Sequence, residues 1–343
     1  MHICIVGGIF DKPASYRVRH SISPETVLAD GLREQGCTVT VCGHSAALPT
    51  SDDADIIHVH HFGRAALRLA TAIRRPPFVF TTHDPFAMNS LPVAWKRRFA
   101  DRYVLRHADA VVALSAAERD FLIRRYALPS CRITVIPNGI PTTVFDRVPE
   151  PAPSAPANSF LLFVGQLQKF KGLDFLLDAL PAVRASYPQV RLRLVYQTGA
   201  LLRHYQAVTG RLGLTGCVEF AGPQPSAALA QLYSAATLVV SPSLGECLST
   251  VVLEAMGCGA TVVATDVGGI REQLDDDTGV IVPPRDASAL SRAICGLLAD
   301  PARRQRLGQA AREKARAQFS VPKMIRRHLR LYESLLETDE RAA

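Results

Sequence analysis

Short apolar runs alternate with longer helix-like stretches along nearly all of the 343-residue chain. The runs are apolar at consecutive positions, which is typical of strands buried on both faces of a parallel sheet. Strands separated by helices predict a doubly wound α/β architecture. We expect strands at 3–6, 38–42, 56–60, 78–82, 110–114, 133–136, 160–164, 192–196, 218–221, 238–240, 261–264 and 280–282. We expect helices at 24–35, 65–73, 93–107, 116–126, 173–185, 200–212, 226–235, 251–256, 287–298, 301–318 and 321–338.

A proline-rich segment interrupts this alternation at residues 147–158. Its prolines forbid a continuous helix or a central strand, so the segment predicts a linker. The length of the chain also favours two domains over a single core. We therefore expect an N-terminal domain at 1–147, a linker at 148–158 and a C-terminal domain at 159–322.

The composition is that of a globular protein with large cores, with 48% apolar and 20% charged residues. The formal charge of +8 is spread along the chain. That favours an anionic small molecule or surface over a nucleic-acid arm, and no known nucleic-acid module is present. The eight cysteines form no Cys-x-x-Cys pair, which indicates a reduced, cytosolic protein without a zinc site. With no leader before the first strand and no long apolar run, we expect a cytoplasmic protein.

The segment 241–269 carries the strongest chemical signal. An apolar strand ends at Ser241, the next loop contains Glu246, and a short helix then places Glu254 on its second turn. The unpaired amides and positive dipole end of a helix N-terminus attract phosphate. Carboxylates accept hydrogen bonds from sugar and ribose hydroxyls. The segment therefore predicts a binding site for a nucleotide sugar.

The chain resembles the retaining GT-B glycosyltransferases of family 4 over nearly its whole length. The most specific element is the E-x7-E signature from Glu246 to Glu254, continued by Glu-Ala-Met-Gly-Cys-Gly and Val-Val-Ala-Thr-Asp-Val-Gly-Gly-Ile-Arg-Glu. Supporting motifs are Asp-Ile-Ile-His-Val-His at 55–60, Thr-Thr-His-Asp at 81–84, Val-Ile-Pro-Asn-Gly at 135–139, Phe-Val-Gly-Gln-Leu at 163–167, Lys-Gly at 171–172 and Thr-Gly-Val-Ile-Val-Pro at 278–283.

The resemblance implies two Rossmann-like domains that face each other across a cleft, with the last helix, about 323–343, crossing back to the N-terminal domain. It implies transfer of a sugar, with retention at the anomeric carbon, from a nucleotide diphosphate on the C-terminal domain. The acceptor would lie mainly on the N-terminal domain. No metal or other cofactor is implied, because protein charges neutralise the diphosphate. A UDP-linked hexose or N-acetylhexosamine is favoured over GDP-mannose, and the acceptor is a saccharide, a lipid-linked saccharide or a small metabolite.

The family motifs assign donor contacts to particular residues. Glu254 would bind the ribose hydroxyls, and Glu246 would contact the donor hexose. Lys171 would stabilise charge on the diphosphate leaving group. The plainer alternatives are surface charges for these three residues and a helix N-cap for Ser249. The remaining expected donor contacts are the amides of Cys247, Leu248, Ser249 and Thr250, together with Gly165, Gln166 and Lys169.

One donor position departs from the family pattern. Gln166 stands where the family's Gly-Arg-Leu stretch has an arginine, which removes one bidentate phosphate contact. Lys169 or Arg17 could compensate, or turnover could be slow. Two rival hypotheses stay open: a nucleotide-sugar epimerase or hydrolase on the same fold, and a catalytically weak partner subunit. The spacing of the two glutamates gives no support for a glycosidase pair of carboxylates.

In the N-terminal half, His83 matches the family's active-site histidine beside the transferred sugar, with a structural role as the alternative. Gly7 and Gly8 end the first strand, where they would admit a phosphate or sugar, or simply form a tight turn. Arg17 and Arg19 are candidates for binding a charged acceptor.

Two further patterns have competing interpretations. His58 and His60 lie on one face of a strand, and we favour packing over metal binding because no carboxylate or cysteine motif joins them. The basic and aromatic helix around 95–103 suits peripheral contact with an anionic membrane at its inner face. A charged outer face with an aromatic inner face explains the same pattern.

Overall fold

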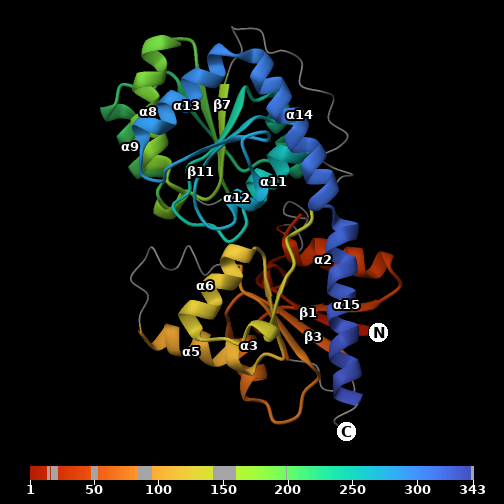
Figure 1. The fold of residues 1–343 in the computed structure, drawn as a ribbon. Helices are drawn as coiled ribbons and strands as arrows, with labels where there is room; N and C mark the ends of the chain where they lie inside the picture. Colours follow the sequence, from red (N-terminus) through yellow and green to blue (C-terminus); the bar gives the residue numbers. More distant parts are fainter. Residues whose placement is uncertain are drawn as a thin grey trace. The chain divides into compact units, whose positions relative to one another are not determined.

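The computed structural model describes residues 1–13, 16, 22–47, 53–83, 95–141, 160–197 and 199–340. The chain divides into two compact units (Figure 1). The N-terminal unit is Met1–Pro141 with Ser320–Ala343, and the C-terminal unit is Thr142–Phe319. The expected linker at 148–158 and the candidate acceptor residues Arg17 and Arg19 lie outside the described residues.

The N-terminal unit contains a six-stranded parallel sheet in the order β2-β1-β3-β4-β5-β6. The chain runs from β1 to β2 on one side and then returns to β3 on the other, so the strand order reverses beside β1. Ligands of doubly wound sheets bind outside the carboxyl ends of the strands at such a reversal. The strands are β1 (His2–Val6), β2 (Thr38–Cys42), β3 (Ile56–His60), β4 (Phe78–Thr81), β5 (Ala110–Ala113) and β6 (Ile133–Val135).

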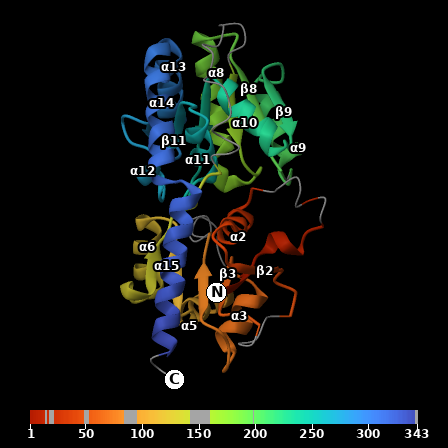
Figure 2. The ribbon, with the colours of Figure 1, turned by 90° about the vertical axis from the view of Figure 1, so that its right-hand side faces the viewer.

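Helices cover both faces of this sheet. One face is covered by α3 (Arg64–Thr71), α5 (Trp95–His107) and α6 (Ala116–Tyr126). The other face is covered by α2 (Pro24–Glu34) and α15 (Val321–Glu340), which pack side by side (Figure 1 and Figure 2). Two short 3-10 turns, η1 (Gly8–Asp11) and η2 (Ser130–Arg132), lie in connections.

The helix ends follow local sequence signals. The hydroxyl of Ser23 caps α2 by accepting a hydrogen bond from the amide of Thr26, and Pro24 occupies the first helical position. Gly31 allows α15 to approach closely, because a Cβ there would lie 2.6 Å from Cδ1 of Ile325. Tyr332 of α15 is fully buried in the core between α15, α2 and the sheet. The last helix therefore completes the core of the N-terminal unit.

The C-terminal unit repeats the architecture with a six-stranded parallel sheet in the order β12-β11-β10-β7-β8-β9. Its order reverses between β7 and β10, which are hydrogen-bonded neighbours. The strands are β7 (Phe160–Val164), β8 (Arg191–Val195), β9 (Val218–Gly222), β10 (Leu238–Ser241), β11 (Val262–Thr265) and β12 (Val280–Val282). The two sheets confirm the predicted doubly wound α/β class.

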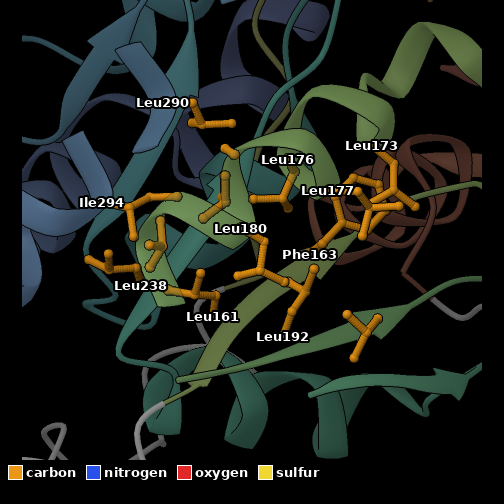
Figure 3. Close-up of a cluster of buried hydrophobic side chains, with 14 of the residues drawn as sticks. Leu161, Phe163, Leu173, Leu176, Leu177, Leu180, Leu192, Leu238, Leu290 and Ile294 are labelled. Atoms are coloured by element: carbon orange, nitrogen blue, oxygen red, sulfur yellow. The ribbon is translucent and has the colours of Figure 1, made fainter. Parts of the chain in front are cut away.

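A large core of this unit lies between the sheet and helices α8 and α13 (Figure 3). Leu161 and Leu238 point from the strands toward Leu180 of α8 and Ile294 of α13. Each buried leucine contributes about 1.5–3 kcal/mol of transfer free energy. The helices and turns are η4 (Lys169–Lys171), α8 (Leu173–Ser186), α9 (Leu202–Arg211), α10 (Ser226–Ala235), α11 (Thr250–Gly257), α12 (Ile270–Gln273), α13 (Ala287–Ala299) and α14 (Pro301–Gln318).

Candidate functional site

An ion pair lies at the strand-order reversal of the C-terminal unit. Nζ of Lys171 is 2.7 Å from Oε1 of Glu246, and the hydroxyl of Ser243 donates to the same oxygen at 2.7 Å. Lys171 follows β7 and Glu246 follows β10, so the pairing of these two strands brings together residues 75 positions apart. Their side chains are only 20% and 11% exposed, so solvent screens this pair weakly.

Two glycines hold the backbone of the loop that carries Glu246. A Cβ on Gly172 would lie 1.8 Å from the carbonyl oxygen of Pro242, and one on Gly268 would lie 1.6 Å from that of Glu246. Both glycines also have positive φ angles, +67° and +51°, which disfavour any side chain. The amide of Leu244 donates to the carbonyl of Phe170 at 2.7 Å. The segments around Gly172 and Gly268 therefore hold the loop from two sides, and both glycines belong to motifs identified from the sequence.

Ser249 caps the helix that follows this loop. Its hydroxyl accepts a hydrogen bond from the amide of Val252 at 3.4 Å, which confirms the predicted N-cap. The amide of Ser249 donates to Oε1 of Gln273 at 2.9 Å, and Nε2 of Gln273 donates back to the Ser249 carbonyl at 2.8 Å. Of the four amides expected to face a diphosphate, that of Ser249 is thus paired within the protein. Cys247 and Leu248 are buried, whereas Thr250 is exposed.

Glu254 lies on the second turn of α11 and has a tyrosine partner. The phenol of Tyr233 on α10 donates to Oε2 of Glu254 at 2.8 Å. Burial raises the pKa of the Glu254 carboxyl to about 7, and the Tyr233 hydrogen bond only partly opposes that rise. Ligand hydroxyls that donate to this carboxylate would favour its charged form and lower its pKa. The group is therefore poised to take up further hydrogen-bond donors.

The other expected donor residues lie around the end of β7. Nζ of Lys169 is 2.9 Å from Oδ1 of Asp174 and 2.9 Å from Nε2 of His204, so a carboxylate already balances its charge. Gln166 is exposed, and the amide of Gly165 donates to the carbonyl of Val195 at 3.0 Å. Lys169 and Lys171 therefore differ in their partners although both lie in η4.

A cluster of histidines lies at the carboxyl ends of β3 and β4 in the N-terminal unit. Nδ1 of His58 is 2.6 Å from the hydroxyl of Tyr332, and its Nε2 is 2.7 Å from the hydroxyl of Thr81. His58 thus ties β3 to β4 and α15. Within the described ranges, no group of three or more histidine, cysteine, aspartate or glutamate side chains is arranged to hold a metal ion.

His83 faces this cluster from a left-handed backbone conformation with a φ of 58°. Its Nε2 is 2.7 Å from Nδ1 of His60, and the two rings stack with centroids 4.9 Å apart. The ring of His61 lies 4.6 Å from that of His83 and is tilted, and Nε2 of His61 is 3.1 Å from Oε1 of Glu25. Burial lowers the pKa of His60 and His83 well below the ordinary histidine value. Both rings are therefore neutral at pH 7.

The two glycines after β1 differ in their surroundings. A Cβ on Gly7 would lie 2.8 Å from Cγ of Glu25, so glycine there admits this buried carboxylate of α2. Burial opposes ionisation of Glu25, but the hydrogen bond with His61 holds its pKa below the usual range. Gly8 has only an ordinary contact, 3.7 Å to Cδ2 of His44. Any side chain at position 7 would therefore collide with Glu25. The sequence did not indicate this contact.

The hydrogen bond between His60 and His83 predicts an unusual tautomer. Nε2 of His60 is buried without a partner among the described residues, and a proton there would be left unpaired. We therefore expect His60 to donate from Nδ1 to Nε2 of His83, which leaves the His83 proton on Nδ1. Long-range nitrogen-15 NMR correlations on histidine-labelled protein measure this directly. A His83 proton on Nε2 would contradict the assignment. His60→Phe removes this hydrogen bond, so the His83 proton should no longer be confined to Nδ1.

Two family models match the chain. The model described as Glycosyltransferase Family 4 matches residues 48–144, and that described as Glycosyl transferases group 1 matches residues 158–300. A D-inositol 3-phosphate glycosyltransferase from Kineococcus radiotolerans is 32% identical over 333 residues, which cover 87% of this chain and 77% of the relative. The chain belongs to glycosyltransferase family 4. A second relative of the same name, from Frankia alni, is 33% identical over 82% of this chain and 74% of its own length.

Solved structures show that this glycosyltransferase has the GT-B fold. Sucrose-phosphate synthase from Thermosynechococcus elongatus matches with a TM-score of 0.82 at 23% identity, covering 98% of this chain and 99% of that one. HepE from Anabaena, solved in complex with UDP-glucose, matches with a TM-score of 0.79 at 22% identity, covering 97% and 100%. Members of this family transfer a sugar from a nucleotide sugar, so the chain is an enzyme that uses such a donor.

Several residues that contact the candidate site residues of this glycosyltransferase were not predicted from the sequence. Tyr233 binds Glu254, Gln273 binds both polar backbone groups of Ser249, and Glu25 binds His61. None belongs to a motif identified from the sequence. Gln273 does directly follow the Gly-Gly-Ile-Arg-Glu stretch, so extending that motif by one position would have included it. Tyr233 and Glu25 carried no such signal.

Proposed function

We propose that this glycosyltransferase moves a hexosyl or N-acetylhexosaminyl group from a UDP-linked donor to a hydroxyl acceptor, with retention at the anomeric carbon. The observation that carries the proposal is the Lys171–Glu246 pair, with Nζ and Oε1 2.7 Å apart at the strand-order reversal of the C-terminal unit. A cation at that edge suits a diphosphate, and a carboxylate suits the hydroxyls of the transferred sugar.

Each residue has a defined role in this proposal. Lys171 exchanges its bond to Glu246 for the diphosphate and stabilises the charge that develops on the leaving group. Glu246 is then available to accept hydrogen bonds from the sugar. Glu254 accepts from the ribose hydroxyls, and Tyr233 orients its carboxylate. His83 offers Nδ1–H to the transferred sugar as a polar contact, because burial keeps it neutral.

The comparisons favour particular substrates. UDP and UDP-glucose occupy the solved structures of HepE, which has the same fold. The curated relatives described above are named for D-inositol 3-phosphate, a small phosphorylated polyol. We propose a small-molecule or saccharide acceptor, and a phosphorylated one would suit the Arg17 and Arg19 candidates of the N-terminal unit.

The experiment that tests the function is a product assay. The protein is incubated with UDP-glucose, UDP-galactose, UDP-N-acetylglucosamine and GDP-mannose, each with inositol phosphate or simple saccharides, and nucleotide release is followed by chromatography. Proton NMR then assigns the anomer of the product. An α-glycoside from an α-linked UDP-sugar supports the proposal, whereas an inverted product contradicts it. A free epimerised sugar would instead favour an epimerase, and donor binding without turnover would favour the catalytically weak subunit.

We expect turnover without a divalent cation. In this proposal the amino group of Lys171 and the remaining backbone amides at the start of α11 neutralise the diphosphate. The measurement compares initial rates in EDTA with rates after Mg²⁺ or Mn²⁺ is restored. We expect the rates with and without a divalent cation to agree within about twofold. Complete loss in EDTA with recovery on Mn²⁺ would show that a metal carries the charge.

We expect Gln166→Arg to tighten diphosphate binding or raise turnover. Residue 166 is exposed at the end of β7, where a guanidinium could add a bidentate phosphate contact. One such preorganised contact is worth about 2.7–4 kcal/mol elsewhere, so even a tenth of that gain is measurable. Gln166→Lys is the matched control, because it adds the positive charge without the paired N–H donors of a guanidinium. If neither variant alters UDP affinity or rate, position 166 does not face the diphosphate.

A further inference from the structure

One face of the N-terminal unit concentrates exposed apolar side chains. Apart from Met1, the exposed large hydrophobic residues of the described chain are Leu67 and Ile73 at α3, and Phe99 and Tyr103 on α5. Phe99 is 72% exposed and Ile73 is fully exposed. Leu67 lies on α3, Ile73 lies just beyond its end, and Phe99 and Tyr103 lie on α5. Exposed apolar side chains that gather into one patch mark protein or membrane interaction sites.

The two helices present these residues side by side. Ala65, Ala66 and Leu69 of α3 and Val104 and Leu105 of α5 pack into the same core against one face of the sheet. The helices also contact each other directly, and they lie next to one another in Figure 1. Their outward faces therefore form one continuous surface, which we name the α3–α5 face.

Positive charge surrounds the apolar side chains of the α3–α5 face. The stretch 64–75 contains four arginines and no acidic residue. On α5, Asp101 is buried, and Asp109 just after the helix pairs with Arg75 at 2.5 Å. Among the side chains that the structure describes, Arg64, Arg68, Arg74, Arg102 and Arg106 are basic and exposed on this face.

We propose that the α3–α5 face docks on a membrane surface rich in anionic lipids. Arginines meet lipid phosphates, while the aromatic and aliphatic side chains between them enter the headgroup region. A nucleic acid would use the arginines but leave Phe99 and Ile73 in water. A partner protein with an acidic surface would need apolar pockets matched to four separated side chains. The fluid headgroup region of a membrane adapts to them instead. No helix of the described chain is long and apolar enough to cross a membrane, so the contact is peripheral.

The test uses the full chain and sedimentation with vesicles. Vesicles of phosphatidylglycerol and phosphatidylcholine in equal parts are compared with phosphatidylcholine alone, at low and high salt. We expect binding to the anionic vesicles that weakens with salt, and little binding to the neutral ones. Absence of binding to the anionic vesicles, or equal binding to both compositions, overturns the proposal.

Variants locate the surface. Each basic residue near an anionic surface contributes about fivefold in binding, so Arg64→Glu with Arg102→Glu should weaken partition by at least about thirtyfold. Ile73→Ser with Phe99→Ser should weaken it by about tenfold. The matched control, Arg303→Glu with Arg306→Glu, makes the same charge change on exposed positions of α14 and should bind far better than the α3–α5 charge variant. Equal loss in the control, or unchanged binding in both α3–α5 variants, overturns the assignment. Circular dichroism and UDP affinity verify that every variant is folded.

Discussion

Replacing Lys171 with methionine is expected to lower turnover by about 100- to 1,000-fold. The amino group is the cation beside Glu246, with Nζ and Oε1 2.7 Å apart, and its charge would stabilise the departing diphosphate. Because this stabilisation matters most as the bond to the sugar breaks, kcat should fall more than donor affinity. The measurement is steady-state kinetics with a saturating acceptor, together with calorimetric UDP binding.

Lys169→Met is the matched control for this prediction. Lys169 lies in the same short turn and is also a lysine, but its amino group binds Asp174 and its side chain is 52% exposed. We expect its removal to change turnover by less than about tenfold, as for other screened surface contacts. A larger loss for Lys169→Met than for Lys171→Met would assign the diphosphate role to Lys169. Equal and small losses would place the leaving group elsewhere.

The affinity for UDP-glucose is expected to rise with pH between about 6 and 8 and to depend on Glu254. The carboxyl has a pKa of about 7 in the free protein, and in the proposed site the ribose hydroxyls would donate to its charged form. Below that pKa, each pH unit costs up to about tenfold in affinity. UDP-glucose suits this measurement because its diphosphate does not titrate near neutral pH.

Glu254→Gln keeps the shape of the side chain but removes its charge. One or more charged hydrogen bonds, each worth about 1.5–3 kcal/mol, would be lost at pH 8, which weakens binding by about 10- to 150-fold. The variant should also bind with little pH dependence. Calorimetric titrations of both proteins across this range decide the matter. A variant that binds as tightly as the wild type at pH 8, or that retains the full pH dependence, contradicts the ribose assignment.

The same carboxyl predicts a stability effect with a defined sign. Its pKa in the folded protein, about 7, is above the ordinary value of 4.5, so the folded state binds more protons between those two values. Stability therefore falls as pH rises through this window. Glu254→Gln should remove that part of the pH dependence, which denaturant unfolding at a series of pH values would detect.

The strand and helix order could be predicted from the sequence because both signals are local. Consecutive apolar residues mark 160–164 and 280–282, and both strands occur with those bounds. The cap at Ser249 and the placement of Glu254 on the following helix are equally local. The short turns η1, η2 and η4 and the four-residue helix α12 were missed, because so few residues carry no periodicity.

Contacts across the fold could not be predicted in the same way. Lys171 and Glu246 were both identified, but their mutual ion pair depends on the neighbouring positions of β7 and β10. Tyr233 reaches Glu254 from another helix, and Glu25 reaches His61 from α2. The packing of whole elements sets these pairings, so no spacing along the chain reveals them. Family motifs identify the candidate site residues, and the structure adds the residues that contact and orient them.

Hydrogen exchange with and without UDP, read by mass spectrometry, tests most directly whether the nucleotide binds at the reversal between β7 and β10. We expect slower exchange in the presence of UDP at residues 165–172 and 243–254, where Lys171, Glu246 and Glu254 lie. We expect unchanged exchange on α13, which packs in the core on one face of the sheet. Protection confined to the N-terminal unit, for example at 7–11 and 60–63, would contradict the account.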